Sequence, residues 1–260
     1  MTPKGPVRVA AVGDVHMDSD VVGRYRPAMD TIGTRADLLL LAGDLTRHGT
    51  VEEAECVARE FQDLPVPIVA VLGNHDYHSD QVHRVTKTLE SAGIIVIECS
   101  GTVITCAGVR IGIAGTKGFG GGFAGRCGSE FGEPEMKAFI SHTRQLAERF
   151  ASAMRELECD VRVALTHYSP VEETLAGEPP EIYPFLGSYL LAEAIDSVEG
   201  VALALHGHAH AGSERGMTPG GVPVRNVAHP VIGNAYGIYQ INIPDHHSAA
   251  NERGTGSVSR

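Results

Sequence analysis

Short apolar runs alternate with polar segments along the N-terminal part of the chain. Runs rich in Val, Ile and Leu, typical of strands buried on both faces, occupy residues 7–14, 37–44, 67–74 and 94–99. Polar segments of helical length lie between them, at 20–35, 50–63 and 79–92. In the second of these, Thr50 and Glu53 have the spacing of a capping box, which favours a helix start there. The alternation predicts successive β-α units with parallel strands.

The pattern changes after residue 100 of the sequence. Two apolar runs, 101–106 and 109–115, are separated by Ala107-Gly108, which predicts a β-hairpin with a two-residue turn. Eight glycines fall within 115–132, and a helix is predicted from Pro134 to about Leu157. A second round of elements follows, with strands at 161–167 and 201–210, a helix near 188–198 and two further strands before residue 242.

These elements predict an α/β fold arranged as a four-layer α/β/β/α sandwich. Roughly ten strands are too many for one comfortable open sheet, so we expect two mixed sheets packed face to face with helices outside. No composition shift marks a boundary, and residues 1–244 are assigned to a single domain. The tail 245–260 has almost no apolar residues, and we expect it to be disordered.

Composition narrows the classes of function. The 260 residues include 21 Lys and Arg against 32 Asp and Glu, for a formal net charge of −11, which argues against a broad basic surface for long nucleic acid. No apolar run reaches the roughly 18 residues of a membrane span, and the N-terminus lacks a signal-peptide pattern. We therefore expect a cytoplasmic protein without a membrane partner. Five scattered cysteines, never spaced C-x-x-C, indicate neither a disulfide framework nor a thiolate zinc site.

Residues of the metal-binding types stand where five apolar runs end. They are Asp14 and His16; Asp44; Asn74, His75 and Asp76; His167; and His208 with His210. Because ligands of open α/β sheets bind at the carboxyl ends of strands, we expect these segments to meet at one edge. The candidate ligands exceed the needs of one tetrahedral ion but suit two metals that share a carboxylate. A donor set of nitrogen and oxygen without thiolate favours Mn, Fe or Zn.

On these residues the sequence resembles the calcineurin-like metallophosphoesterases over about residues 7–242. The matching blocks are Asp14-x-His16, Gly43-Asp44, Gly73-Asn74-His75-Asp76, His167 and Gly207-His208-x-His210. The resemblance implies that Asp14, His16 and His210 hold a first metal, and that Asp44 bridges to a second. It implies that Asn74, His167 and His208 complete the second site. His75 would be the substrate-facing catalytic residue, with Asp76 as its orienting partner.

The same resemblance implies a binuclear metal-dependent phosphoesterase. A hydroxide held between the ions would attack phosphorus in line, and His75 would protonate the leaving oxygen. We expect the substrate partner to be a small-molecule phosphodiester such as a cyclic nucleotide, because the acidic chain disfavours a long polyanion. A phosphomonoesterase or protein phosphatase, a DNA nuclease and an inactive scaffold stay open as alternatives, as does assembly into a homodimer.

Several further residues are candidates for secondary roles. His206 is expected to end its strand as a core residue, whereas His78 and His229 are candidates to line the site. The glycine-rich stretch 116–132 is either a surface excursion or a lid, and its Lys117 and Arg126 are candidates to contact substrate phosphate. Tyr168 and Tyr183 either stack on a base or pack their loop down.

Overall fold

The computed structural model describes residues 6–241, and the predicted disordered tail 245–260 lies outside that range. A first sheet contains, in spatial order, β13 (Gly237–Ile241), β1 (Val7–Val12), β2 (Leu38–Ala42), β3 (Ile68–Val71) and β4 (Ile94–Val96). A second sheet contains β11 (Arg215–Met217), β12 (Pro223–Asn226), β10 (Val201–His206), β9 (Val161–Thr166), β6 (Val109–Thr116) and β5 (Ser100–Cys106). A small hairpin pairs β7 (Gly122–Phe123) with β8 (Arg126–Cys127).

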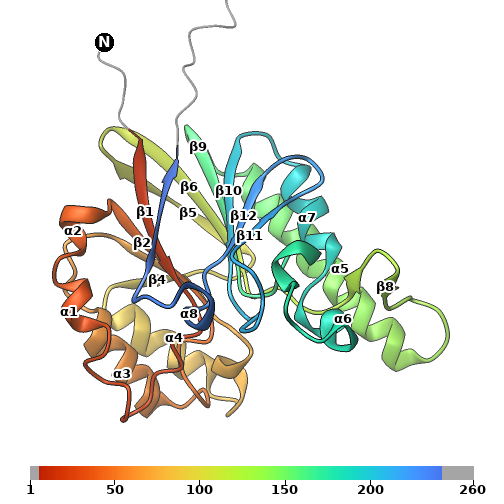
Figure 1. Cartoon of the computed structure of the whole chain (residues 1–260), viewed down its shortest axis with the longest axis horizontal. Coiled ribbons are helices and arrows are strands. Elements are labelled where there is room, and N and C mark those ends of the chain that lie inside the picture. Colours follow the sequence, from red (N-terminus) through yellow and green to blue (C-terminus); the bar gives the residue numbers. More distant parts are fainter. Residues whose placement is uncertain (1–5, 242–260) are drawn as a thin grey trace, which may run out of the picture.

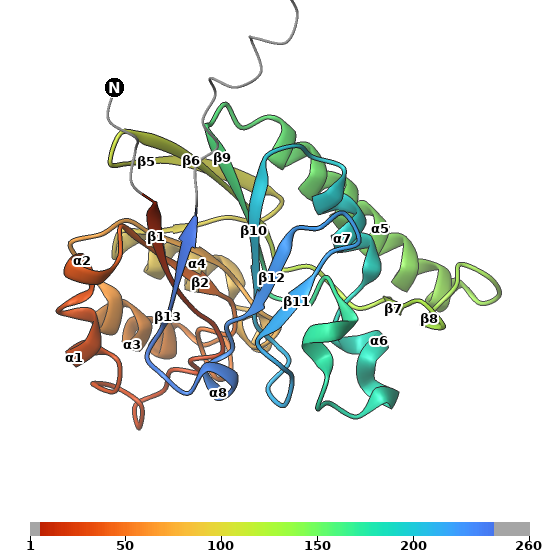
Figure 2. The same ribbon diagram turned by 45° about the horizontal axis from the view of Figure 1, so that its top comes forward.

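Helices cover the outer faces of both sheets (Figure 1). The first sheet is covered by α1 (Arg26–Met29), α2 (Ile32–Arg35), α3 (Val51–Phe61) and α4 (Val82–Ser91). The second is covered by α5 (Pro134–Arg155) and α7 (Tyr189–Asp196). The short helices α6 (Tyr183–Leu186) and α8 (His229–Ile232) lie in connections, and Figure 2 shows α6 near the β7–β8 hairpin. Single 3-10 turns occupy His75–Tyr77, Glu172–Leu175 and Pro180–Ile182.

Three apolar cores confirm the predicted four layers. On β2, Leu38 and Leu40 point into the core between the sheets, whereas Leu39 and Leu41 point into the core beneath α1–α4. All four side chains have 0% exposure, because a central parallel strand is buried on both faces. A third core joins the second sheet to α5 and α7, where Phe150 and Leu191 lie among buried alanines. Successive residues of a strand face opposite ways, so one run of leucines supplies two cores.

The local predictions agree with the structure in most places. The β5–β6 hairpin turns at Ala107 and Gly108, whose φ values of 50° and 76° fit the two-residue turn that the sequence predicts. The capping box of α3 is present. The helix predicted over 20–35 is instead two short helices, because the chain turns at Gly23 with φ of 85° and Pro27 allows a helix to begin only near that point.

The structure also has more strands than the roughly ten predicted, with thirteen among residues 6–241. The additional elements are the two-residue strands β7 and β8 and the three-residue strand β11, which are too short to produce a periodic pattern. Within the described range no helix is both long enough and apolar enough to cross a membrane.

Candidate metal centre

The ends of five strands converge where the two sheets meet. Strands β1, β2 and β3 are parallel neighbours in the first sheet, and β9 and β10 are parallel neighbours in the second. The loops that leave them are tied together by backbone hydrogen bonds. Asp14 donates to Gly43 O at 2.9 Å, and Gly207 donates to His167 O at 3.1 Å. Face-to-face packing of the sheets therefore brings both sets of strand ends to one edge of the sandwich.

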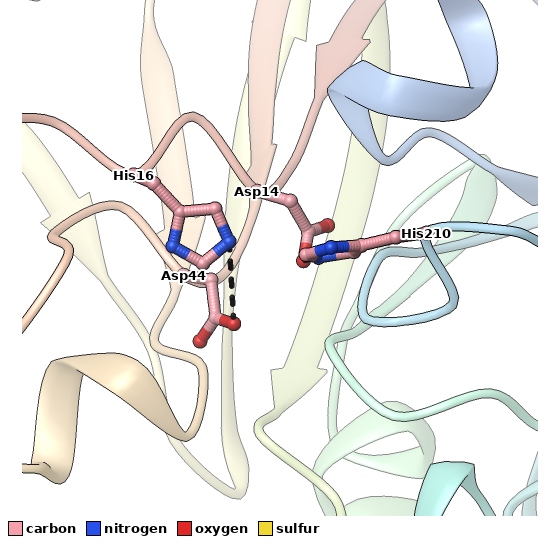
Figure 3. Close-up of side chains that lie close together, drawn as sticks. All are labelled: Asp14, His16, Asp44 and His210. Atoms are coloured by element: carbon pink, nitrogen blue, oxygen red, sulfur yellow. Dashed lines mark hydrogen bonds and ion pairs between the residues drawn. The ribbon is translucent and has the colours of Figure 1, made fainter. Parts of the chain in front are cut away.

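A first group of side chains consists of Asp14, His16, Asp44 and His210 (Figure 3). One potential ligand atom from each lies within 4.8 Å of the others. His210 Nε2 lies 2.8 Å from Asp14 Oδ1, and His16 Nε2 lies 3.9 Å from Asp44 Oδ2. Two carboxylates and two imidazoles so arranged form a donor set of the kind that holds Mn, Fe or Zn.

A second group consists of Asp44, His167 and His208, whose ligand atoms also lie within 4.8 Å of one another. Asn74 joins this group, because its Oδ1 lies 3.0 Å from His167 Nε2. The same imidazole nitrogen lies 3.3 Å from Asp44 Oδ1. The two groups share Asp44, and together with Asn74 they contain the seven candidate ligands at this one edge.

Four of these residues have a backbone conformation that is unusual for residues with a side chain. The φ values of Asp14, His16, Asp44 and His208 are 56°, 42°, 48° and 71°. Left-handed backbone at a residue other than glycine costs about 1–2 kcal/mol and persists where the surroundings enforce it. Strain gathered at the ends of β1, β2 and β10 points to a functional role for this edge.

Two glycines of the motifs are required by close approach. A Cβ at Gly73 would lie 2.1 Å from Asp44 Oδ1, and a Cβ at Gly207 would lie 2.3 Å from Asp14 Oδ2. Neither glycine has a positive φ, so what each supplies is room for a nearby carboxylate.

Backbone carbonyls fix which nitrogen of the His167 and His208 rings faces the centre. His167 Nδ1 lies 2.9 Å from Ala42 O, and His208 Nε2 lies 3.2 Å from Phe185 O. A carbonyl oxygen only accepts, so each of these nitrogens donates a proton. The opposite nitrogen of each ring is then the one available to a cation, an arrangement typical of metal-binding histidines. Both the residue types and the orientation of these two rings therefore suit the expected cations.

His75 and Asp76 have different partners from the ones expected. The His75 ring bonds Arg47 O through Nδ1 at 2.7 Å, and its Nε2 lies 4.0 Å from Asp44 Oδ2. Asp76 is fully buried and accepts hydrogen bonds from the amides of Leu45, Thr46 and Gly73 and from the Thr46 hydroxyl. The pairing of Asp76 with the His75 ring is thus corrected: Asp76 ties the loop after β2 to the end of β3. Burial, followed by the nearby Asp44 charge, raises the pKa of Asp76 to about 6.

Charges within the second group are strongly linked. Burial opposes protonation of His167, but attraction to Asp44 outweighs it and raises the pKa of His167 to about 9. Burial alone would raise the pKa of Asp44, yet the His167 charge and hydrogen bonds from His167 and the His75 amide hold it below its usual range. Burial and then the His167 charge lower the pKa of His208 to about 3. A cation bound by this group would therefore have to displace a proton from His167, whereas His208 would already be neutral.

The other candidate histidines lie outside both groups. His206 is fully buried, with Nδ1 2.7 Å from Gly207 O and Nε2 2.8 Å from Thr174 Oγ1, so it is the core residue that the sequence predicts. His78 is exposed, and its ring centroid lies 6.3 Å from that of His48. His229 is half-buried and packs edge-on against Tyr25 at 5.4 Å.

A third set of ligand-type side chains comprises Asp18, His48 and Glu53. Glu53 is already engaged, because it caps α3 and accepts the His48 amide at 2.7 Å. Asp18 forms an ion pair with Arg47 at 3.0 Å. These contacts account for the cluster without a cation.

The glycine-rich stretch is docked against the loop that follows β9. Gly121 donates to Pro184 O at 2.7 Å and Gly122 to Gly187 O at 2.9 Å. Arg126 is paired with Glu172, and the Tyr183 hydroxyl donates to Leu175 O at 3.1 Å, so both side chains hold this region together. The two remaining candidates, Tyr168 and Lys117, lie beside the metal centre, because the Tyr168 ring packs on His208 and the Lys117 ammonium packs on Tyr168.

Comparison with known proteins identifies the family. The pattern of the calcineurin-like phosphoesterases matches residues 7–212, and no curated relative matches the chain. PptH of Mycobacterium tuberculosis, a phosphopantetheinyl hydrolase, is similar in structure with a TM-score of 0.58 and 14% identity, over 95% of this chain and 99% of its own. The protein TT1561 of Thermus thermophilus has a TM-score of 0.56 and 19% identity, over 85% and 88%. GAP50, the anchor in the inner membrane complex of Plasmodium, has a TM-score of 0.53 and 14% identity, over 87% and 73%.

These findings define the class of protein. The match spans the five strand ends, and the chain belongs to the calcineurin-like phosphoesterase family. This family consists of metal-dependent phosphoester hydrolases, and the two ligand groups are the corresponding candidate metal sites. The solved structures show a shared fold, consistent with the two mixed sheets and outer helices described above.

Proposed function

We propose that the protein is a binuclear phosphodiesterase that hydrolyses small phosphodiesters such as cyclic nucleotides. The observation that carries this proposal is the buried carboxylate of Asp44, which belongs to both ligand groups and is 1% exposed. A carboxylate shared in this way suits two cations a short distance apart, as in two-metal hydrolases. Asp14, His16 and His210 would hold one cation, and Asn74, His167 and His208 the other.

The charge of the donor set supports a diester. Two divalent cations carry four positive charges, whereas Asp14, Asp44 and the hydroxide that the cations would supply for in-line attack carry three negative ones, so a surplus of about one positive charge would remain. Neutral Asn74 preserves this surplus, because an aspartate at that position would cancel it. A phosphodiester carries one negative charge and a phosphomonoester nearer two, so the diester is the better match.

The residues of the chain have separate tasks in this reaction. His75 is the catalytic residue, because its side chain is 43% exposed and Nε2 faces the shared carboxylate at 4.0 Å. The Arg47 carbonyl holds Nδ1–H of that ring and leaves Nε2 facing the centre, so a ring that also carries a proton on Nε2 would donate that proton to the leaving oxygen and return to its neutral form. Asp76 is a positioning residue that acts on the strand ends. The structural neighbour PptH is a phosphopantetheinyl hydrolase, which fits a small organic phosphoester as substrate.

One experiment separates the proposal from its alternatives. The protein is purified without chelator, its metals are counted by elemental analysis, and hydrolysis of bis(4-nitrophenyl) phosphate is compared with that of 4-nitrophenyl phosphate. Two metals per chain and a higher kcat/KM for the diester are expected. Preference for the monoester would favour a phosphomonoesterase, and two bound metals without turnover of either compound would favour a scaffold. Asp44→Asn should lower metal content and rate together.

A further inference from the structure

Lys117 lies at the same sheet edge as the candidate metal ligands. It follows β6, whose last residue Thr116 pairs with Thr166 at the end of β9. The Lys117 carbonyl accepts the amides of His167 at 3.1 Å and Tyr168 at 3.0 Å. Its backbone is therefore fixed directly beside the segment that carries a proposed metal ligand.

The ammonium group of Lys117 is surrounded by aromatic rings. Nζ lies 5.1 Å from the ring centroid of Phe119, 5.2 Å from that of Tyr168 and 5.3 Å from that of Tyr77. Nζ also donates a hydrogen bond to Gly118 O at 3.2 Å. Each of these ring faces attracts a cation electrostatically. We call these three rings and the lysine the Lys117 cage.

Within residues 6–241 the ammonium forms no ion pair with a carboxylate. Glu98 is close, but its carboxylate accepts the Lys117 amide and the Thr116 hydroxyl, each at 2.7 Å. Burial lowers the pKa of Lys117, and the charges of Glu98 and Asp44 act against that effect. Glu98 thus acts on the ammonium through its charge but does not bond it directly, and a partly buried ammonium without a direct carboxylate contact is suited to receive an anion from outside the chain.

The Lys117 cage shares a wall with the metal centre. The Tyr168 ring centroid lies 4.3 Å from that of His208, so a single aromatic ring separates the ammonium from a proposed ligand. Tyr77 stands two residues after His75 in the same 3-10 turn. The cage also borders an apolar surface, because the ring centroids of Phe119 and Phe139 lie 5.0 Å apart.

That apolar surface reaches solvent at Phe185, whose side chain is 60% exposed. The Phe139 and Phe185 ring centroids are 6.4 Å apart, and the Phe185 carbonyl is the group that orients His208. An anion receptor and an aromatic surface thus adjoin the metal centre on one side. A substrate that used all three would carry a planar or apolar body and a second negative charge.

We propose that the Lys117 cage is a substrate-binding subsite that receives a second anionic group of the substrate beside the scissile phosphate. This inference rests on the proposed function and deepens it. The substrate class is a phosphodiester that carries an additional phosphate or carboxylate next to an aromatic or apolar portion. Lys117 is the specificity-determining residue of this subsite.

A matched pair of compounds tests the subsite. Thymidine 5′-(4-nitrophenyl phosphate) and its 3′-phosphorylated form release the same 4-nitrophenolate and differ by one phosphate. For the 3′-phosphorylated form, Lys117→Met should raise KM about tenfold or more with little change in kcat, because a charge-assisted contact is lost. For the compound without the 3′-phosphate, the change in KM should be much smaller, so that Lys117→Met loses the preference of the parent protein for the 3′-phosphorylated form. Lys137→Met, which removes an exposed lysine from α5, is the control and should change neither compound.

A structural role for Lys117 gives a different result. If the lysine only holds its rings together, Lys117→Met and Lys117→Gln would lower the thermal midpoint and affect both compounds equally, and the proposal would be wrong. Equal KM values for the two compounds in the parent protein would also overturn it.

Binding without turnover separates this inference from the proposed function. Calorimetry on the metal-loaded protein compares thymidine 3′,5′-bisphosphate with thymidine 5′-monophosphate. Tighter binding of the bisphosphate that Lys117→Gln abolishes supports the subsite even if neither nitrophenyl ester is hydrolysed. Equal affinity for the two nucleotides in the parent protein overturns the subsite. It does not bear on the phosphodiesterase proposal, which is tested by the hydrolysis of bis(4-nitrophenyl) phosphate.

Discussion

Replacing Gly73 with alanine tests whether the position of the Asp44 carboxylate controls the metal centre. The new Cβ would lie 2.1 Å from Asp44 Oδ1 and 2.3 Å from the Asp44 amide nitrogen. Ordinary contacts between carbon and these atoms start above 3 Å. The carboxylate must therefore move by roughly 1 Å, a displacement that can cost about a hundredfold in rate at a catalytic centre. Because Asp44 belongs to both ligand groups, the metal content should fall below two per chain.

The assay needs a control for stability, since overpacking at Gly73 also costs about 1–3 kcal/mol. Gly93→Ala provides it, because Gly93 has a φ of 83°, follows α4, and would bring its Cβ within 4 Å of no other atom. Its left-handed backbone makes that substitution destabilising by about 1–2 kcal/mol while the metal centre stays intact. Thermal unfolding, metal per chain and hydrolysis of bis(4-nitrophenyl) phosphate are measured for both variants.

Both variants should lose thermal stability. Only Gly73→Ala should also lose bound metal and hydrolysis rate. If Gly73→Ala keeps two metals and a rate within a few-fold of the parent, the placement of Asp44 does not control the centre. The bridging assignment would then be wrong, whatever the change in stability.

Three further predictions concern catalysis, metal and pH. His75→Ala should lower kcat by about a hundredfold or more with both metals retained, because the His75 ring belongs to neither ligand group; loss of metal in elemental analysis would contradict this. Chelation should lower the thermal midpoint, since cations at a hundredfold excess over Kd stabilise the folded state by about 3 kcal/mol, and re-addition of Mn should restore it. Burial lowers the pKa of His206 to about 4 from its ordinary 6.5, so its stabilising contribution is complete above pH 6.5 and is lost as the pH falls toward 4. The free energy of unfolding is measured with denaturant at pH 7.5 and at pH 5. In His206→Gln the loss of stability between these two pH values should be about 2 kcal/mol smaller than in the parent protein, and an equal loss in both would refute the buried-imidazole argument.

The layer arrangement was predictable because the strands carry an unambiguous signal. Four consecutive leucines on β2, all fully buried, can be accommodated only where both faces of a strand are covered. The strand-end residues were predictable for a related reason. A polar residue that directly follows such a run lies at the carboxyl edge of its sheet, and topology then brings the edges together.

The role of Asp76 was not predictable from its place beside His75. Adjacent residues suggested a paired carboxylate and imidazole, but both lie in a 3-10 turn, where successive side chains point about 120° apart. The imidazole therefore meets the Arg47 carbonyl, and the carboxylate meets the amides of Leu45 and Thr46. Sequence patterns do not identify the carbonyls that orient the rings, since every residue offers one.

The division of the ligands between the two sheets gives the candidate centre a structural consequence. Asp14, Asp44 and Asn74 leave strands of the first sheet, whereas His167 and His208 leave strands of the second. The core between the sheets is apolar and non-directional, so it does not by itself fix how the strand ends align. The contact of His167 with Asp44 and Asn74 supplies direction at this edge, and the left-handed residues hold their side chains toward it. Catalytic geometry therefore depends on the register between the sheets, which is why the close fit at Gly73 and Gly207 bears on function as well as on stability.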